Sequence, residues 1–170
     1  MANKLNSMRL LQARGLVFSA KEYDPSGEFH SAVEAAQLIG APLASVYKTL
    51  VVLREPPKAG KTILVMIPSN AEVDLKLLAK SLKSPKQKLR MATQREAESL
   101  TGLRVGGISA LALVNRGFEV CIDASASVLE QIHVSAGERG VDLQVGVKDL
   151  IEVTRAKSVE AVSFPKKTEG

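Results

Sequence analysis

The stretch Val46-Tyr47-Lys48-Thr49-Leu50-Val51-Val52-Leu53 predicts a buried β-strand that is interrupted by one charged residue, Lys48. Lysine carries a positive point charge with three hydrogen-bond donors, so in a concave site it could bind a phosphate or donate to a carbonyl oxygen. The alternative is a strand edge at which the ammonium group reaches water and the stem lies along apolar surface. The strand alone does not decide between these two interpretations.

A glycine pair set among apolar residues forms the second unusual feature, Val105-Gly106-Gly107-Ile108-Ser109. Glycines permit positive φ and a close approach of backbone to a ligand, and their amides could stabilise a developing oxyanion. The same pair is equally typical of a simple tight turn. Ser109 could orient a ligand, or it could cap the turn, as serines in loops usually do.

Polar residues elsewhere in the chain offer further candidates. Asp142 follows the turn at Arg139-Gly140 and could bind a ligand ammonium group, or hold that turn by side-chain hydrogen bonding. The densest basic stretch, between Lys83 and Arg95, could follow a phosphate backbone or be a solvated surface. Cys121 lies in an apolar run and is predicted to be a buried structural thiol. His133 is expected on the outward face of a strand.

Strands and helices are interspersed along the chain without a strict βαβ rhythm. The predicted fold class is therefore α/β, a single domain over residues 1–170 with a mixed sheet surrounded by helices and a frayed tail at 165–170. Neighbouring strands at 46–67 and at 118–145 suggest hairpins. Helices are predicted at 8–14, 31–39, 74–82, 93–102 and 147–153, and strands at 17–23, 46–54, 62–67, 118–122, 131–135 and 141–145.

Composition limits the class of protein, its compartment and its partners. The chain has 170 residues, 45% of them hydrophobic, which fits one domain with a substantial core. One cysteine excludes an internal disulfide, and no secretory signal or membrane-length apolar segment is visible, so we expect a cytoplasmic protein. The net charge of +5 mildly favours a polyanionic partner such as RNA.

Several common chemistries leave no pattern in the chain. No zinc-ligand spacing, phosphate-binding glycine loop or nucleophile elbow occurs, so the sequence predicts neither a metal site nor a bound cofactor. Only four Phe and two Tyr are present, which disfavours broad base stacking of the kind that single-strand binders use.

Taken together and in this order, four segments resemble the YbaK family of aminoacyl-tRNA deacylases, which is related to the editing domain of bacterial prolyl-tRNA synthetases. They are Glu22-Tyr23-Asp24-Pro25, residues 46–52, residues 105–109, and Val134-Ser135-Ala136-Gly137 through to Leu143. The resemblance covers roughly residues 5–155. It implies a curved, barrel-like mixed sheet and hydrolysis of mischarged aminoacyl-tRNA, most characteristically Cys-tRNA(Pro).

The resemblance also implies roles for individual residues and partners. Lys48 would be the main functional residue, with Gly106 and Gly107 beside it in the catalytic site. The residues implied to line the substrate pocket are Tyr23, Phe29, Ser109 and Asp142. The implied partners are tRNA, most characteristically tRNA(Pro), and prolyl-tRNA synthetase.

One departure from the family pattern follows the glycine pair. The family usually continues Gly-Gly-Ile-Ser with Pro-Leu-Gly, whereas this chain has Ala110-Leu111-Ala112, so we expect a looser or reshaped loop, which leaves the amino-acid specificity open. The alternatives are therefore hydrolysis of another ester, such as Ala-tRNA(Pro) or a Ser-tRNA, and a non-catalytic module that binds tRNA or a synthetase.

Overall fold

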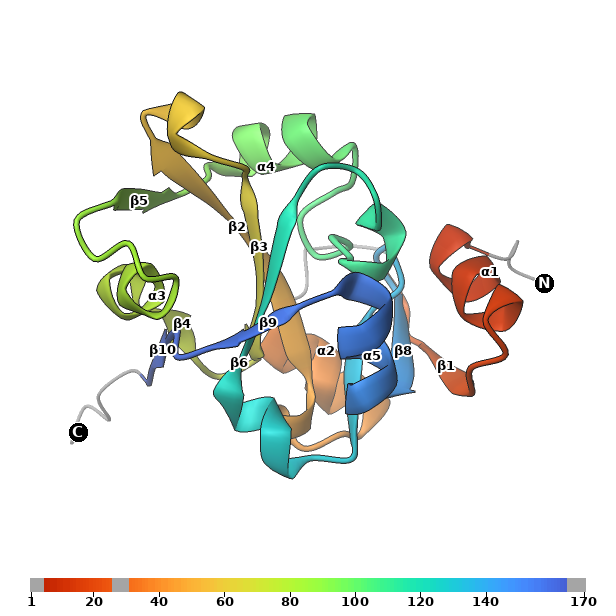
Figure 1. The fold of residues 1–170 in the computed structure, drawn as a ribbon. Coiled ribbons are helices and arrows are strands. Elements are labelled where there is room, and N and C mark those ends of the chain that lie inside the picture. Colours follow the sequence, from red (N-terminus) through yellow and green to blue (C-terminus); the bar gives the residue numbers. More distant parts are fainter. Residues whose placement is uncertain (1–4, 26–30, 165–170) are drawn as a thin grey trace.

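The computed structural model describes residues 5–25 and 31–164, in which five α-helices and ten strands alternate irregularly (Figure 1). The helices are α1 (Asn6–Ala13), α2 (Ala32–Ile39), α3 (Leu75–Ser81), α4 (Gln94–Thr101) and α5 (Val147–Thr154). The strands are β1 (Phe18–Glu22), β2 (Tyr47–Glu55), β3 (Ile63–Pro68), β4 (Glu72–Val73), β5 (Lys88–Met91), β6 (Glu119–Asp123), β7 (Gln131–Ser135), β8 (Val141–Gly146), β9 (Lys157–Val159) and β10 (Val162–Ser163).

Two sheets form the body of the protein. The larger is mixed and has the order β5-β2-β3-β6-β9, in which β6 pairs in parallel with both of its neighbours. The smaller is antiparallel, with the order β1-β8-β7. A single parallel bridge from Val46, just before β2, to His133 in β7 joins them. This arrangement confirms the expected mixed α/β fold.

The hairpin predictions are confirmed in part. β2 pairs with β3 and β7 pairs with β8, each in antiparallel fashion. The expectation fails for β6, which joins β3 and β9 instead of its sequence neighbour β7. The 3₁₀ turn Ala124–Val128 after β6 carries the chain from one sheet to the other. Asp123 caps this turn by accepting from the Ser125 amide at 3.0 Å.

Two apolar clusters hold these layers together. The larger fills the space between the two sheets and includes Leu64, Ile122, Leu143 and Leu150, none more than 1% exposed. The smaller lies on the other face of the five-stranded sheet, where α3 packs at the left of Figure 1. β3 is buried along its whole length because both of its faces are covered. Burial on both faces explains the nearly unbroken apolar run from Ile63 to Pro68.

Local capping interactions fix the ends of α2 and α4. Thr93 and Glu96 form a complete capping box at the start of α4, and Ser31 caps α2 by accepting from the Glu34 amide at 3.2 Å. Gly40 and Gly102 end α2 and α4 in the left-handed conformation.

The loop after the glycine pair, which we expect to be looser or reshaped relative to the family pattern, is compact. Leu111–Leu113 form a 3₁₀ turn, and Ala110 and Leu111 are both buried. Ala110, at the position of the family's proline, and Leu111 thus pack into the core, whereas Ala112 is half-buried. Two predictions fall on residues outside the described ranges: the position of Phe29 and the tail at 165–170.

Candidate functional site

A cavity of about 260 Å³ opens beside β2, in the gap between the two sheets. It exists because β5 covers only the second half of β2: the β2–β5 ladder begins at Val52, and the bridge to β7 lies at Val46. The edge of β2 between these points faces open space. The cavity is lined by Tyr23, Ser31, Ala32, Ala35, Val46, Tyr47, Lys48, Thr49, Leu50, Val51, Met91, Ala92, Gln94, Ala97, Val105, Gly106, Ile108, Ser135 and Asp142.

Lys48 lies in this cavity, on the strand that the sequence predicted. Its Nζ donates to the Ser69 carbonyl oxygen at 3.2 Å, and Ser69 is itself held by a 2.7 Å hydrogen bond from its Oγ to the Leu43 carbonyl oxygen. Burial lowers the pKa of Lys48, and the nearby Glu72 opposes that shift. An ammonium group has three donors, so two remain for a ligand in the cavity.

The two glycines have different surroundings. Gly106 lines the cavity with φ of +94°, a conformation that favours glycine, and its amide donates to no other described residue. The Gly107 amide instead donates to the Arg104 carbonyl oxygen at 2.7 Å. A Cβ atom on Gly107 would lie 2.9 Å from backbone atoms of Glu138 and Arg139. Gly106 can therefore offer an amide to a ligand, whereas Gly107 allows two backbone segments to pack closely.

Ser109 is also apart from the cavity. Its side chain is buried, and its Oγ accepts from the Ala112 amide at 3.2 Å. Of the two interpretations open from the sequence, the turn-capping one describes this geometry.

Asp142 and Tyr23 reach the cavity from the small sheet. Asp142 is opposite Ser135 in the β7–β8 ladder and is 5% exposed, and burial raises its pKa to about 6. Tyr23 follows β1 and donates its amide to the Gly140 carbonyl oxygen at 2.9 Å. Burial also raises the pKa of the Tyr23 hydroxyl. The structure thus brings Lys48, Gly106, Tyr23 and Asp142 to one cavity.

Two further polar residues in the cavity were not singled out from the sequence. Thr49 is 8% exposed, and its Oγ1 has no hydrogen-bond partner within the described part of the chain. Ser135, on β7, lines the same cavity. Both lie in segments that carry the family resemblance, residues 46–52 and 134–143, and Thr49 also neighbours Lys48 in the strand.

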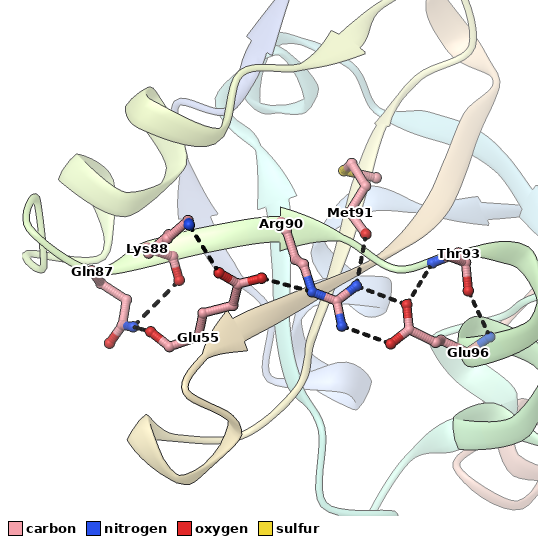
Figure 2. Close-up of polar contacts among 7 residues, drawn as sticks. All are labelled: Glu55, Gln87, Lys88, Arg90, Met91, Thr93 and Glu96. Carbon is pink, nitrogen blue, oxygen red and sulfur yellow. Dashed lines mark hydrogen bonds and ion pairs between the residues drawn. The ribbon is translucent and has the colours of Figure 1, made fainter.

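The wall formed by β5 and α4 is fixed by a charged cluster (Figure 2). Arg90 donates to both carboxylate oxygens of Glu96 at 2.7 Å and contacts Glu55 at 2.9 Å. The Arg90 guanidinium holds the pKa of Glu96 down at about 2. Because Met91 follows Arg90 and lines the cavity, this cluster sets the position of the wall.

Other candidate groups lie outside the cavity lining. His133 was expected on an outward strand face, but it is 8% exposed, because the segment at 43–46 lies against β7. Cys121 is buried in the small apolar cluster, as predicted, and burial raises the pKa of its thiol to about 12. Within residues 5–25 and 31–164, no group of three potential metal ligands is found. No helix in those ranges is long and apolar enough to cross a membrane.

Comparison with known proteins adds independent findings. Residues 27–153 match the family model described as aminoacyl-tRNA editing domain. A relative from Enterococcus faecalis, with the provisional name Cys-tRNA(Pro)/Cys-tRNA(Cys) deacylase EbsC, is 30% identical over 157 residues, which cover 92% of each chain.

Solved structures share the fold at lower identity. The crystal structure of hypothetical protein APE2540 has a TM-score of 0.77 at 24% identity, covering 91% of this chain and 97% of that one. A structure described as a candidate trans-editing enzyme for prolyl tRNA synthetase has a TM-score of 0.76 at 22% identity, covering 95% and 99%. At such identities the likeness concerns the fold.

Proposed function

This chain belongs to the family of aminoacyl-tRNA editing domains, and we propose that its cavity hydrolyses the ester of cysteinyl-tRNA(Pro). Family membership confirms the expected activity class, deacylation of aminoacyl-tRNA. The choice of cysteine and of tRNA(Pro) is supported by the name of the Enterococcus faecalis relative.

The observation that carries this proposal is a cavity with polar groups at its rim and no histidine or cysteine among its described lining residues. An aminoacyl ester is already activated, so placement and oxyanion stabilisation can supply much of the catalysis. In cysteinyl-tRNA the substrate thiol attacks its own ester carbonyl, and the thiol proton passes to the departing ribose oxygen. Water then opens the resulting cyclic thioester to release cysteine.

The size of the cavity supports a division of the substrate. A volume of about 260 Å³ is below the ~300–1,000 Å³ of pockets for drug-sized ligands, so it suits an aminoacyl group better than a nucleotide. In the proposed complex the terminal adenosine stays at the mouth. Lys48 then contacts its phosphate or the ester carbonyl oxygen, and the Gly106 amide faces the developing negative charge.

Asp142 and Tyr23 shape the amino-acid end of the cavity in this proposal. A carboxylate in an apolar wall attracts the substrate ammonium group, which is the only cation that the ester carries. Phe29 stays a prediction for the same region.

The partners and the compartment follow from the substrate. Aminoacyl-tRNA is the substrate class of the family, and we propose in addition that the protein acts beside prolyl-tRNA synthetase, where Cys-tRNA(Pro) forms by mischarging. Such editing is needed because a synthetase pocket distinguishes one methylene by only ~1–3 kcal/mol. We also propose that the protein acts in the cytoplasm.

A panel of mischarged tRNAs tests the proposal. Purified protein is incubated with Cys-tRNA(Pro), Ala-tRNA(Pro), Ser-tRNA and correctly charged Pro-tRNA(Pro), and each loss of ester is compared with loss in buffer. We expect the cysteinyl ester to be hydrolysed fastest and the prolyl ester to survive. Hydrolysis of the alanyl ester alone would exclude the substrate-thiol mechanism. Salt-dependent tRNA binding without any hydrolysis would indicate a non-catalytic binding module.

A further inference from the structure

Thr49 lies in the part of β2 that pairs with β3 on one side and, among the described residues, with no strand on the other. Its register partner is Met66 of β3. On the opposite side the pairing with β5 begins at Val52, and the β-bridge to β7 found within the described residues is at Val46. Thr49 therefore forms a free strand edge inside the cavity.

The backbone groups of Thr49 point into this space. The Val46 carbonyl oxygen accepts from the Ser69 amide at 2.7 Å, so it points toward β3. The Val51 carbonyl oxygen accepts from the Ala92 amide at 3.0 Å and so points the other way. Alternate residues of a strand direct their backbone groups to the same side, so the N–H and C=O of Thr49 share the direction of Val51.

These groups have no partner within the described part of the chain. No ladder or loop hydrogen bond engages the Thr49 amide or carbonyl on the cavity side, and its Oγ1 is also unmatched. Buried backbone groups are almost always paired, because leaving one unpaired costs about as much as a lost hydrogen bond. Thr49 thus presents one backbone donor and one backbone acceptor, side by side, to whatever occupies the cavity.

An aminoacyl ester carries the complementary pair. In an antiparallel ladder, two opposed residues exchange both N–H···O=C bonds, and each uses the amino nitrogen and carbonyl oxygen attached to one Cα. An aminoacyl group has these same two atoms on one Cα. Peptides that add a strand to a free sheet edge exploit the same exchange over several residues.

We propose that the substrate's aminoacyl group docks on Thr49 as a single residue of an added strand. Its α-amino group donates to the Thr49 carbonyl oxygen, and its ester carbonyl oxygen accepts from the Thr49 amide. This inference rests on the proposed function and deepens it. Docking on Thr49 would recognise the α-amino and carbonyl groups of any aminoacyl substrate. The other residues that line the cavity would then select the substrate's side chain.

Substrate analogues test the α-amino contact. The same tRNA is acylated with N-formylcysteine or with 3-mercaptopropionate; both acyl groups are uncharged and keep the thiol, but only the first has an N–H. Each enzymatic rate is divided by its own rate in buffer. We expect about tenfold greater acceleration for the N-formyl ester, the effect of about one hydrogen bond. Equal acceleration of the two esters would overturn the inference.

A pair of variants tests the amide contact. Thr49→Val keeps both backbone groups and removes the hydroxyl, whereas Thr49→Pro also removes the N–H. Proline is tolerated where a strand N–H faces away from the ladder, so the β2–β3 pairing should persist, as circular dichroism can verify. We expect kcat/KM of Thr49→Pro on Cys-tRNA(Pro) to be about tenfold below that of Thr49→Val.

The outcomes separate the two proposals. Equal kcat/KM in the two folded variants would refute docking on Thr49. If the proline variant does not fold, the analogue comparison with the natural sequence still decides. Failure of the natural protein to cleave any aminoacyl ester would refute the proposed function itself, together with this inference.

Discussion

Replacing Asp142 by asparagine should stabilise the protein at neutral pH, and the gain in free energy of unfolding should be smaller in acid. Burial raises the pKa of Asp142 from 3.8 to about 6, so the folded state binds its proton more tightly than the unfolded chain does. The stability contributed by the protonated carboxyl is therefore complete below pH ~3.8 and is lost as the pH rises through ~6. Above that pH the fold carries the full cost of an ionised carboxylate in the cavity wall.

The magnitude follows from the two pKa values. One pKa unit corresponds to about 1.4 kcal/mol, so the cost at pH 7.5 is about 3 kcal/mol, of which ~2 kcal/mol should develop between pH 4.5 and 7.5. Water entering the cavity would reduce this amount.

Urea unfolding of the natural protein and of Asp142→Asn at both pH values measures it. We expect the asparagine variant's advantage in free energy of unfolding to be larger at pH 7.5 by about 1–2 kcal/mol. The same advantage at both pH values would refute the argument that burial raises this pKa. Taking the difference between the two proteins cancels the titration of His133 and other shared groups.

Three further outcomes follow from the site. Arg90→Ala should change urea unfolding only slightly, because the pair with Glu96 is partly open to water, yet it should raise KM for aminoacyl-tRNA by releasing the cavity wall. Lys148→Ala, on the exposed side of α5, is the control, and an unchanged KM for Arg90→Ala would contradict this role. Gly107→Ala should lower stability by about 1–3 kcal/mol, since its Cβ would meet backbone 2.9 Å away, and an unaltered melting temperature would show that the loop yields freely. Cys121 should resist thiol reagents in the native protein and react only in denaturant; rapid native labelling would disprove its burial.

Much of the fold could be predicted because the long elements carry strong local signals. The apolar runs of β2 and β3 and the capping box at Thr93–Glu96 mark their elements without reference to the rest of the chain. β5 could not be recognised, because Lys88-Leu89-Arg90-Met91 resembles a basic surface stretch. β4, β9 and β10, at two or three residues each, are defined by their partners alone.

Pairing and burial depended on contacts that are distant in the sequence. β6 pairs with β3, which lies 50 or more positions earlier in the chain, and with β9, which follows α5. The closeness of β7 to β6 in the sequence was therefore misleading. His133 alternates with Ile132 and Val134, which predicts an outward face, but the segment before β2 covers that face.

The candidate site shows the same limit at the scale of single atoms. Family resemblance and residue type identified Lys48, Gly106, Tyr23 and Asp142, which the structure brings to one cavity. The sequence could not tell which glycine amide is already used in a turn. Nor could it reveal the free edge at Thr49, which results from where β5 stops.

The contribution of Lys48 to hydrolysis can be measured by comparing two lysine variants. Hydrolysis of Cys-tRNA(Pro) is measured with the natural protein, Lys48→Ala and Lys148→Ala, after matched unfolding curves show that all three are folded. We expect Lys48→Ala to lose at least tenfold in kcat/KM, about the loss of one charged hydrogen bond, while Lys148→Ala keeps the natural rate. Undiminished hydrolysis by folded Lys48→Ala would contradict this expectation.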